Sequence, residues 1–240
     1  AGAQVTEVAE TLIAQVQNSK AMLGRRDHAG FLTTTFTDAG TDITLINDKG
    51  YDACSYFFPD GKHLIWTSVR DKMGTSGKLE GDWSDWQHYP QGAELYISDR
   101  QGGHVKRLTN NDYYEAEVTV SPDGKWIVFG RQIKGNMDLW VMNADGTGEH
   151  QITFTEDWQE GAPYFLPDSN TILFRAWKAS EYGQRPTPMT IFTIKRDGSD
   201  LKTQTHTHEM NWAPYPTPDG KHFLYVRIEP GSNNWEVYLG

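Results

Sequence analysis

One short motif returns four times along this chain of 240 residues. Each copy places Pro-Asp at a turn and leads directly into a short run of apolar, β-prone residues. Proline sets the backbone angle of the turn, and Asp-Gly provides the side-chain hydrogen bond and the left-handed position that a tight hairpin needs. A turn-then-strand unit that recurs at roughly 45 to 60 residues indicates a repeat architecture. The four copies are Phe58-Pro59-Asp60-Gly61-Lys62, Ser121-Pro122-Asp123-Gly124-Lys125, Leu166-Pro167-Asp168-Ser169-Asn170 and Thr217-Pro218-Asp219-Gly220-Lys221.

Each repeat continues in the same order and predicts four antiparallel strands. In the second repeat, a strand at 126–129 is followed by one at 138–142, the turn Asn143-Ala144-Asp145-Gly146, and a last strand at 149–153. A four-stranded antiparallel sheet repeated around an axis is a propeller blade. We therefore expect an all-β propeller over residues 31–240.

The PDGK turn, the NADG turn and the closing Arg-Leu-Thr or Gln-Ile-Thr resemble the TolB-type, WD-like propeller repeats of bacteria. The resemblance covers about residues 31–240 and implies an extracytoplasmic, periplasmic setting. The first and last blades are incomplete, because 37–46 match the end of a blade and 235–240 match a third strand. Either the N-terminal strand closes the C-terminal blade in a four-bladed ring, or further repeats complete a six-bladed ring. The resemblance favours six blades.

Residues 1–30 predict an amphipathic helix and a linker. Apolar residues at i, i+3, i+4, i+7, i+8 and i+11 form one stripe along the predicted helix. We expect the stripe to dock on the flank of the propeller or on a partner protein. The residues of the stripe are Val5, Val8, Ala9, Leu12, Ile13 and Val16.

Composition excludes several classes of function. A net charge of −10, with 22 basic and 32 acidic residues, argues against a nucleic-acid partner. No run approaches the roughly 18 apolar residues of a membrane span, although peripheral association with a membrane complex is compatible with the sequence. The single cysteine, Cys54, cannot form an internal disulfide, and we expect a small buried residue there.

Strand alternation sorts the connections onto two faces. The PDGK and NADG turns share one face, which we call the turn face. The opposite face, which we call the loop face, receives the links between blades and two long insertions at 71–92 and 176–188. Exposed Trp, Tyr and Arg are enriched in protein interfaces. The insertions therefore predict partner contact, or else aromatic side chains that fold back over their own blades. The residues are Trp83, Trp86, His88, Tyr89, Trp177, Tyr182 and Arg185.

The links between blades predict an acidic and aromatic channel mouth. Its carboxylates could hold a calcium ion, bind a basic segment of a partner, or pair with Lys and Arg and cap backbone amides. His206 and His208 are weak candidates for a transition-metal site, because side chains at i and i+2 of a strand point the same way. The predicted mouth residues are Asp52, Tyr113, Glu115, Glu117, Trp158, Glu160, Asn211 and Trp212.

The sequence contains no G-x-S-x-G, H-E-x-x-H or C-x-x-C motif and no phosphate-binding glycine loop. No catalytic residue and no cofactor can therefore be named. We expect a non-enzymatic binding or scaffold propeller, one subunit of an extracytoplasmic complex with a protein partner. Two alternatives remain open: a non-catalytic propeller that gates a peptidase or amidohydrolase domain, and a metal-dependent propeller related to polysaccharide lyases.

Overall fold

A computed structural model describes residues 31–37, 40–47, 50, 52–72, 86–229, 231–232 and 234–240. For the first two ranges it describes the course of the strands. The predicted helix and linker of residues 1–30 lie outside the described residues.

The described chain is built from antiparallel sheets of sequential strands. A two-stranded sheet contains β1 (Phe31–Thr37) and β2 (Gly40–Asn47). Blade 1 contains β3 (Asp52–Phe57), β4 (His63–Ser68), β5 (Glu94–Asp99) and β6 (Lys106–Arg107). Blade 2 contains β7 (Tyr114–Val120), β8 (Trp126–Ile133), β9 (Asn136–Asn143) and β10 (His150–Gln151). Blade 3 contains β11 (Trp158–Phe165), β12 (Thr171–Lys178), β13 (Thr190–Lys195) and β14 (Lys202–Thr203). Blade 4 contains β15 (Met210–Pro216), β16 (Phe223–Ile228) and β17 (Glu236–Leu239).

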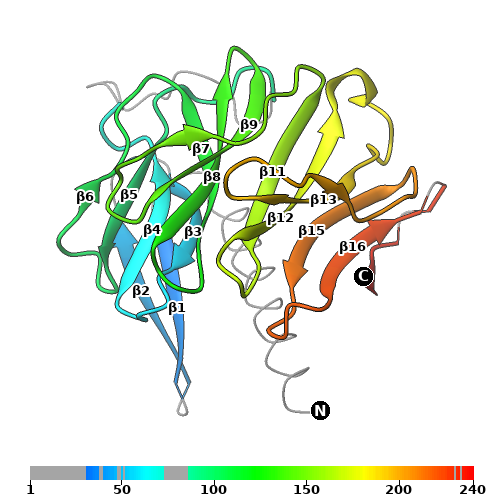
Figure 1. Ribbon diagram of the computed structural model, residues 1–240. Coiled ribbons are helices and arrows are strands. Elements are labelled where there is room, and N and C mark those ends of the chain that lie inside the picture. Colours follow the sequence, from blue (N-terminus) through cyan, green and yellow to red (C-terminus); the bar gives the residue numbers. More distant parts are fainter. Residues whose placement is uncertain are drawn as a thin grey trace.

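These sheets are arranged as a fan, with the two-stranded sheet and blade 4 at opposite ends (Figure 1). The predicted all-β fold with four-stranded antiparallel sheets is confirmed. In the described part of the chain β2 pairs with β1, and the sheet of blade 4 consists of β15, β16 and β17. The N-terminal strand therefore does not complete blade 4, contrary to the four-bladed alternative. The six-bladed ring stays a prediction.

The repeated turn has the predicted geometry in all four copies. The aspartate Oδ1 accepts a hydrogen bond from the backbone N–H two residues later, at 2.7 Å for Asp60, 3.1 Å for Asp123, 2.9 Å for Asp168 and 3.1 Å for Asp219. The next residue has a positive φ even in the copy without glycine, where Ser169 has φ 54°. All four turns lie at the entry to a second strand, toward the bottom of Figure 1.

The closing threonine of the repeat fastens the short fourth strand to the third. The hydroxyl oxygens of Thr109, Thr153 and Thr205 accept hydrogen bonds from the backbone N–H of Leu95 (2.9 Å), Leu139 (2.8 Å) and Ile191 (2.9 Å). A buried N–H without a partner would be costly. The threonine hydroxyl therefore accepts a hydrogen bond from a third-strand N–H that the two-residue fourth strand would leave without a partner.

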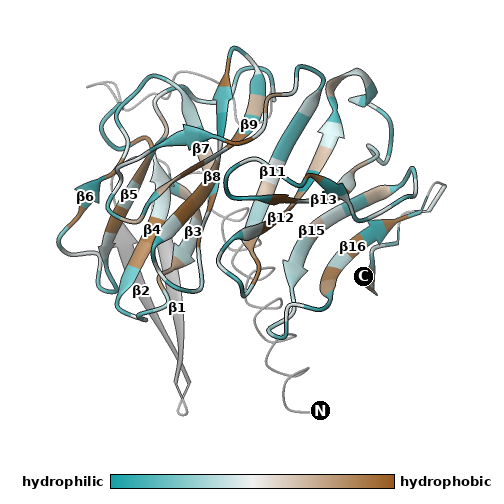
Figure 2. Ribbon diagram, in the orientation of Figure 1, coloured by the Kyte–Doolittle hydropathy of each residue, from teal (hydrophilic) through white to brown (hydrophobic). Residues whose placement is uncertain are grey.

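Apolar side chains pack between the blades, and central strands of the blades are coloured as hydrophobic in Figure 2. One cluster joins Phe129 and Met142 of blade 2 to Ile65 and Leu95 of blade 1. A second joins blade 2 to blade 3 around Phe174, which is 2% exposed. Face-to-face packing of this kind orients each blade, so that its loops project from one end.

Each innermost strand bends at an equivalent bulge. Cys54, Glu117, Ala162 and Ala213 have positive φ and lie six residues before the turn aspartate. The bulge turns the following side chains toward the axis. Tyr56 and Tyr164 come from blades that are not neighbours, yet their ring centroids lie 6.2 Å apart, and Tyr164 lies 5.1 Å from Tyr215. These three tyrosines meet at the centre of the fan.

Candidate functional site

The loop face is formed by connections of very different length. β8 and β9 are joined by a tight turn at Lys134 and Gly135, both with positive φ. By contrast, long insertions join β4 to β5 and β12 to β13, the second containing the short 3-10 helix η1 (Ala179–Glu181). The predicted sorting of irregular connections onto one face is confirmed in the described residues (Figure 1).

The two insertions meet above blade 2. Trp86 packs against Trp177 with ring centroids 4.9 Å apart and against Tyr182 at 5.4 Å, and Trp177 and Tyr182 lie 5.5 Å apart. The Gln132 side chain of blade 2 donates a hydrogen bond to the backbone carbonyl of Trp86. Because the turn between β8 and β9 is short, the insertion of blade 1 can cross blade 2 and reach blade 3. We call Trp86, Trp177 and Tyr182 the aromatic bridge.

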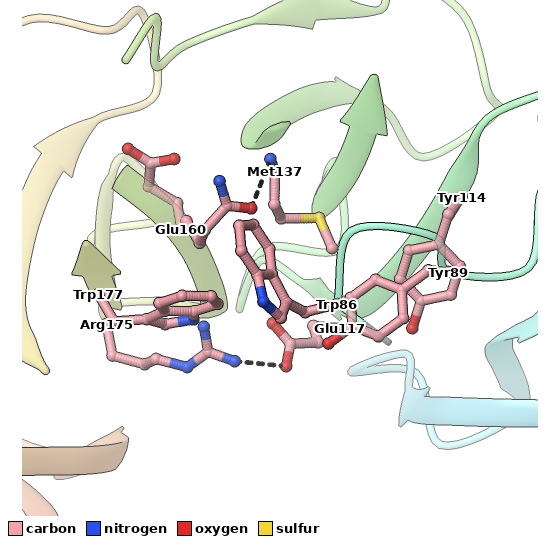
Figure 3. A pocket seen from close by; sticks show the side chains of 9 residues that line it. Trp86, Tyr89, Tyr114, Glu117, Met137, Glu160, Arg175 and Trp177 are labelled. Atoms are coloured by element: carbon pink, nitrogen blue, oxygen red, sulfur yellow. Dashed lines mark hydrogen bonds and ion pairs between the residues drawn. The ribbon is translucent and has the colours of Figure 1, made fainter. Parts of the chain in front are cut away.

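A small pocket of about 50 Å³ lies beside the bridge (Figure 3). Figure 3 shows the Trp86 ring between the Trp177 side chain and the rings of Tyr89 and Tyr114. The Glu117–Arg175 ion pair lies below the Trp86 ring in this view. The space is sufficient for a few water molecules or one small functional group. Its lining residues are Trp86, Tyr89, Tyr114, Glu117, Met137, Gln159, Glu160, Arg175 and Trp177.

The ion pair in the pocket clamps blade 2 to blade 3. Arg175 Nη2 donates to Glu117 Oε1 at 2.8 Å, and the backbone N–H of Ala162 donates to Glu117 Oε2 at 2.7 Å. Gly161 provides the room, because a Cβ at this position would lie 2.0 Å from Glu117 Oε2 and 2.6 Å from Arg175 Nη1. Glycine is therefore required at position 161 by the clamp.

The predicted partner-binding residues are divided between exposed and packed positions. Tyr182 is 49% exposed, and His88 and Arg185 are also exposed. Trp177 is only 9% exposed, and Tyr89 packs on Tyr114 with centroids 4.6 Å apart. The prediction of an exposed Trp177 is wrong, because the ring is covered by the insertion of another blade. Trp83 lies outside the described residues.

Three of the predicted mouth residues are buried within the fold and do not line an open mouth; Glu115 instead follows the open alternative of pairing with arginine. Glu115, Glu160 and Asn211 occupy the same position of successive innermost strands and are 0%, 3% and 0% exposed. Their side chains lie before the bulge and turn into the blade, where Arg131 binds Glu115 and Arg227 binds Asn211. Asp52 holds the same position in blade 1 and is half-buried.

The remaining mouth residues lie closer to the surface. Tyr113 is 37% exposed and Trp212 is 40% exposed, while Trp158 and Glu117 are half-buried. Sequence reasoning missed the axial tyrosines Tyr56, Tyr164 and Tyr215. Their signal was available: each lies four residues before the aspartate of a repeated turn.

Burial shifts the pKa of two groups near the site. Burial raises the pKa of Glu160 to about 8, and the neighbouring Asp138 carboxyl adds to this rise. Burial likewise raises the pKa of the Cys54 thiol to about 12, so this cysteine is protonated at neutral pH. Cys54 packs against a buried cluster of blades 1 and 2 but is only half-buried, so the predicted burial holds in part.

The described residues contain no group of three or more His, Cys, Asp and Glu side chains that could hold a metal ion. His206 and His208 are both exposed, and His208 Nε2 lies 3.5 Å from Glu181 Oε1. Calcium binding at the mouth stays an untested expectation. Among the described residues, no helix is long and apolar enough to cross a membrane.

Comparison with known proteins agrees with this geometry. The sequence model of the family described as "Tricorn protease N-terminal beta propeller domain" matches residues 90–240. An uncharacterized protein of Agrobacterium fabrum (strain C58) is 26% identical over 245 residues, covering 89% of this chain and 80% of the relative.

Among solved structures, TolB from Acinetobacter baumannii superimposes with a TM-score of 0.64 at 16% identity, covering 87% of this chain and 45% of TolB. This chain thus spans less than half of that protein. A mutant puromycin hydrolase matches with a TM-score of 0.57 at 13% identity, covering 84% of this chain and 29% of the hydrolase. These likenesses show a shared TolB-type propeller fold.

Proposed function

The chain belongs to the family of the Tricorn protease N-terminal beta propeller domain, and we propose that it is a non-enzymatic propeller that binds a protein partner through its loop face. We place this activity in an extracytoplasmic assembly, as the TolB-type repeats imply. Cell fractionation of the native protein tests the location, and recovery in the cytosolic fraction would contradict it.

The observation that carries this proposal is the aromatic bridge. A single hydrophobic cluster made from two insertions is a rigid feature, because each ring is fixed by the other two. Its outer member, Tyr182, keeps about half of its surface exposed at 49%. Large aromatic side chains held in place and partly exposed are typical anchors of protein interfaces.

Polar side chains surround this anchor on the loop face. His88 and Arg185 are exposed, and Glu181 lies next to Tyr182 with its carboxylate 3.5 Å from His208. An apolar centre with a charged rim is the usual anatomy of a protein interface. The pocket beside the bridge could accept the tip of one partner side chain.

The test is co-purification of the intact native protein, with identification of the proteins that elute with it. Tyr182→Ala should reduce recovery of the partner at least about tenfold, since anchor residues contribute 2 kcal/mol or more. Phe154→Ala is a matched control, because Phe154 is a 76% exposed aromatic on an inter-blade link outside the bridge. Both variants should keep the melting temperature of the parent. Equal partner recovery for Tyr182→Ala and the parent, or elution as a lone monomer, would contradict the proposal.

A second candidate function follows from the family itself, whose description names the propeller of a protease. In this alternative the chain gates the active site of a peptidase domain. The full reading frame distinguishes the two functions, because only the gating propeller requires a hydrolase motif in the same polypeptide.

A further inference from the structure

Two buried carboxyl groups meet at the junction of blades 2 and 3. Asp138 on β9 is 7% exposed and Glu160 on β11 is 3% exposed. Thr155, on the link between the blades, binds both: its hydroxyl donates to Glu160 Oε1 at 2.6 Å, and its backbone N–H donates to Asp138 Oδ1 at 3.3 Å. Asn136 completes the contact by donating to Asp138 Oδ2 at 2.8 Å and to the Thr155 carbonyl at 2.6 Å.

Blades 2 and 4 place an arginine where this junction has none, whereas in blade 1 the register partner of Asp52 is Ser68. Glu115 is paired in register with Arg131, whose Nε donates to Glu115 Oε1 at 2.7 Å, and Asn211 is paired with Arg227 at 3.1 Å. The register partner of Glu160 is Ala176. Blade 3 therefore retains the buried acid of the repeat without the cation that accompanies it in blade 2.

The charges around Glu160 do not replace that cation. Asp138 of β9 contributes a second acid, and Arg175 of β12 is bound by Glu117 of β7. On the link itself, Glu156 and Asp157 are exposed. Glu160 Oε2 is buried and has no hydrogen-bond partner among the described residues. Burying an unpaired carboxylate is strongly unfavourable, whereas a protonated carboxyl is tolerated.

We propose that Asp138 and Glu160 form a proton-controlled joint between blades 2 and 3, closed while Glu160 holds a proton and opened at mildly alkaline pH when it is lost. The ionised Glu160 requires water at Oε2, and the route for water is the link at 153–157. Opening this link moves the pocket wall, because Gln159 and Glu160 both line the pocket. The high pKa of Glu160, about 8, is consistent with a transition at mildly alkaline pH.

The joint is tested on the full chain by carboxyl-carbon NMR between pH 4 and 10, with Glu160→Gln used for assignment. We expect the Glu160 signal to titrate with a midpoint above pH 6.5. Asp138→Asn should lower that midpoint by removing the neighbouring acid, and it provides a second route to assignment if Glu160→Gln fails to fold. A Glu160 midpoint near the ordinary value of 4.5 would overturn the proposal.

Hydrogen exchange then tests whether ionisation opens the link. After correction for intrinsic exchange, protection of residues 153–160 should fall at least about tenfold between pH 6 and pH 9 in the parent, and not in Glu160→Gln. Residues 109–115 are the matched control, because Arg131 binds the buried acid of that link. The same loss of protection in both links, or in the parent and Glu160→Gln alike, would overturn the proposal.

Discussion

Replacing Gly161 with alanine tests whether the clamp between blades 2 and 3 stabilises the fold. The new Cβ would lie 2.0 Å from Glu117 Oε2, so the carboxylate must leave its position. Glu117 would then lose the hydrogen bond from Ala162 N–H and its ion pair with Arg175. Gly161 does not have a positive φ, so alanine adds no backbone strain at this position.

The expected cost follows from those two contacts. Hydrogen bonds to charged groups contribute about 1.5–3 kcal/mol each. The Glu117 side chain is 30% exposed, which weakens both contacts through solvent screening. We therefore expect Gly161→Ala to lower the free energy of unfolding by about 2–4 kcal/mol. For a chain of this size, that corresponds to a fall in Tm of about 5–15 °C.

Urea denaturation of a double-mutant cycle measures the effect. In a Glu117→Ala background the carboxylate is already absent, so Gly161→Ala should cost less than about 1 kcal/mol. Gly130→Ala is the matched control, because Gly130 is another strand glycine and its Cβ would meet the flexible Met137 side chain at 3.0 Å. Additive costs of Gly161→Ala and Glu117→Ala would refute the reasoning, since the clash would then lie outside the clamp.

Two further predictions concern packing and pH. Leu139 and Val237 hold the same register position in blades 2 and 4 but are 0% and 60% exposed. In denaturant melts, Leu139→Ala should therefore lower the free energy of unfolding by about 2–5 kcal/mol and Val237→Ala by less than about 0.5 kcal/mol. Similar losses for the two variants would show that the blade 4 position is also covered. Because the pKa of Glu160 is raised in the folded chain, the unfolded chain loses this proton at a lower pH than the folded chain does. The free energy of unfolding should therefore fall by roughly 3–5 kcal/mol from about pH 4.5 to pH 8 and then level off. Glu160→Gln should flatten this slope, and an unchanged slope would contradict the assignment.

Much of the fold follows from local rules that the sequence displays directly. The geometry of the Pro-Asp-Gly turns can be predicted from five residues of chain. The aspartate side chain accepts a hydrogen bond from the backbone N–H two residues later, and the residue between them has a positive φ. Strand alternation then assigns each connection to a face without any knowledge of packing. For these reasons the blades, the turns at Asp60 and Asp219, and the irregular face were all predictable.

Side-chain surroundings depend on contacts between distant segments, and here only the tertiary structure decides. Glu115 and Glu160 look alike in the sequence, yet one meets Arg131 and the other Ala176 across the sheet. Trp177 is covered because an insertion about ninety residues earlier crosses a neighbouring blade. The sequence by itself determines which residues can form a strand or a turn. The packing of blades determines which of them are charged, covered or exposed, because burial and electrostatic pairing are properties of the assembled core.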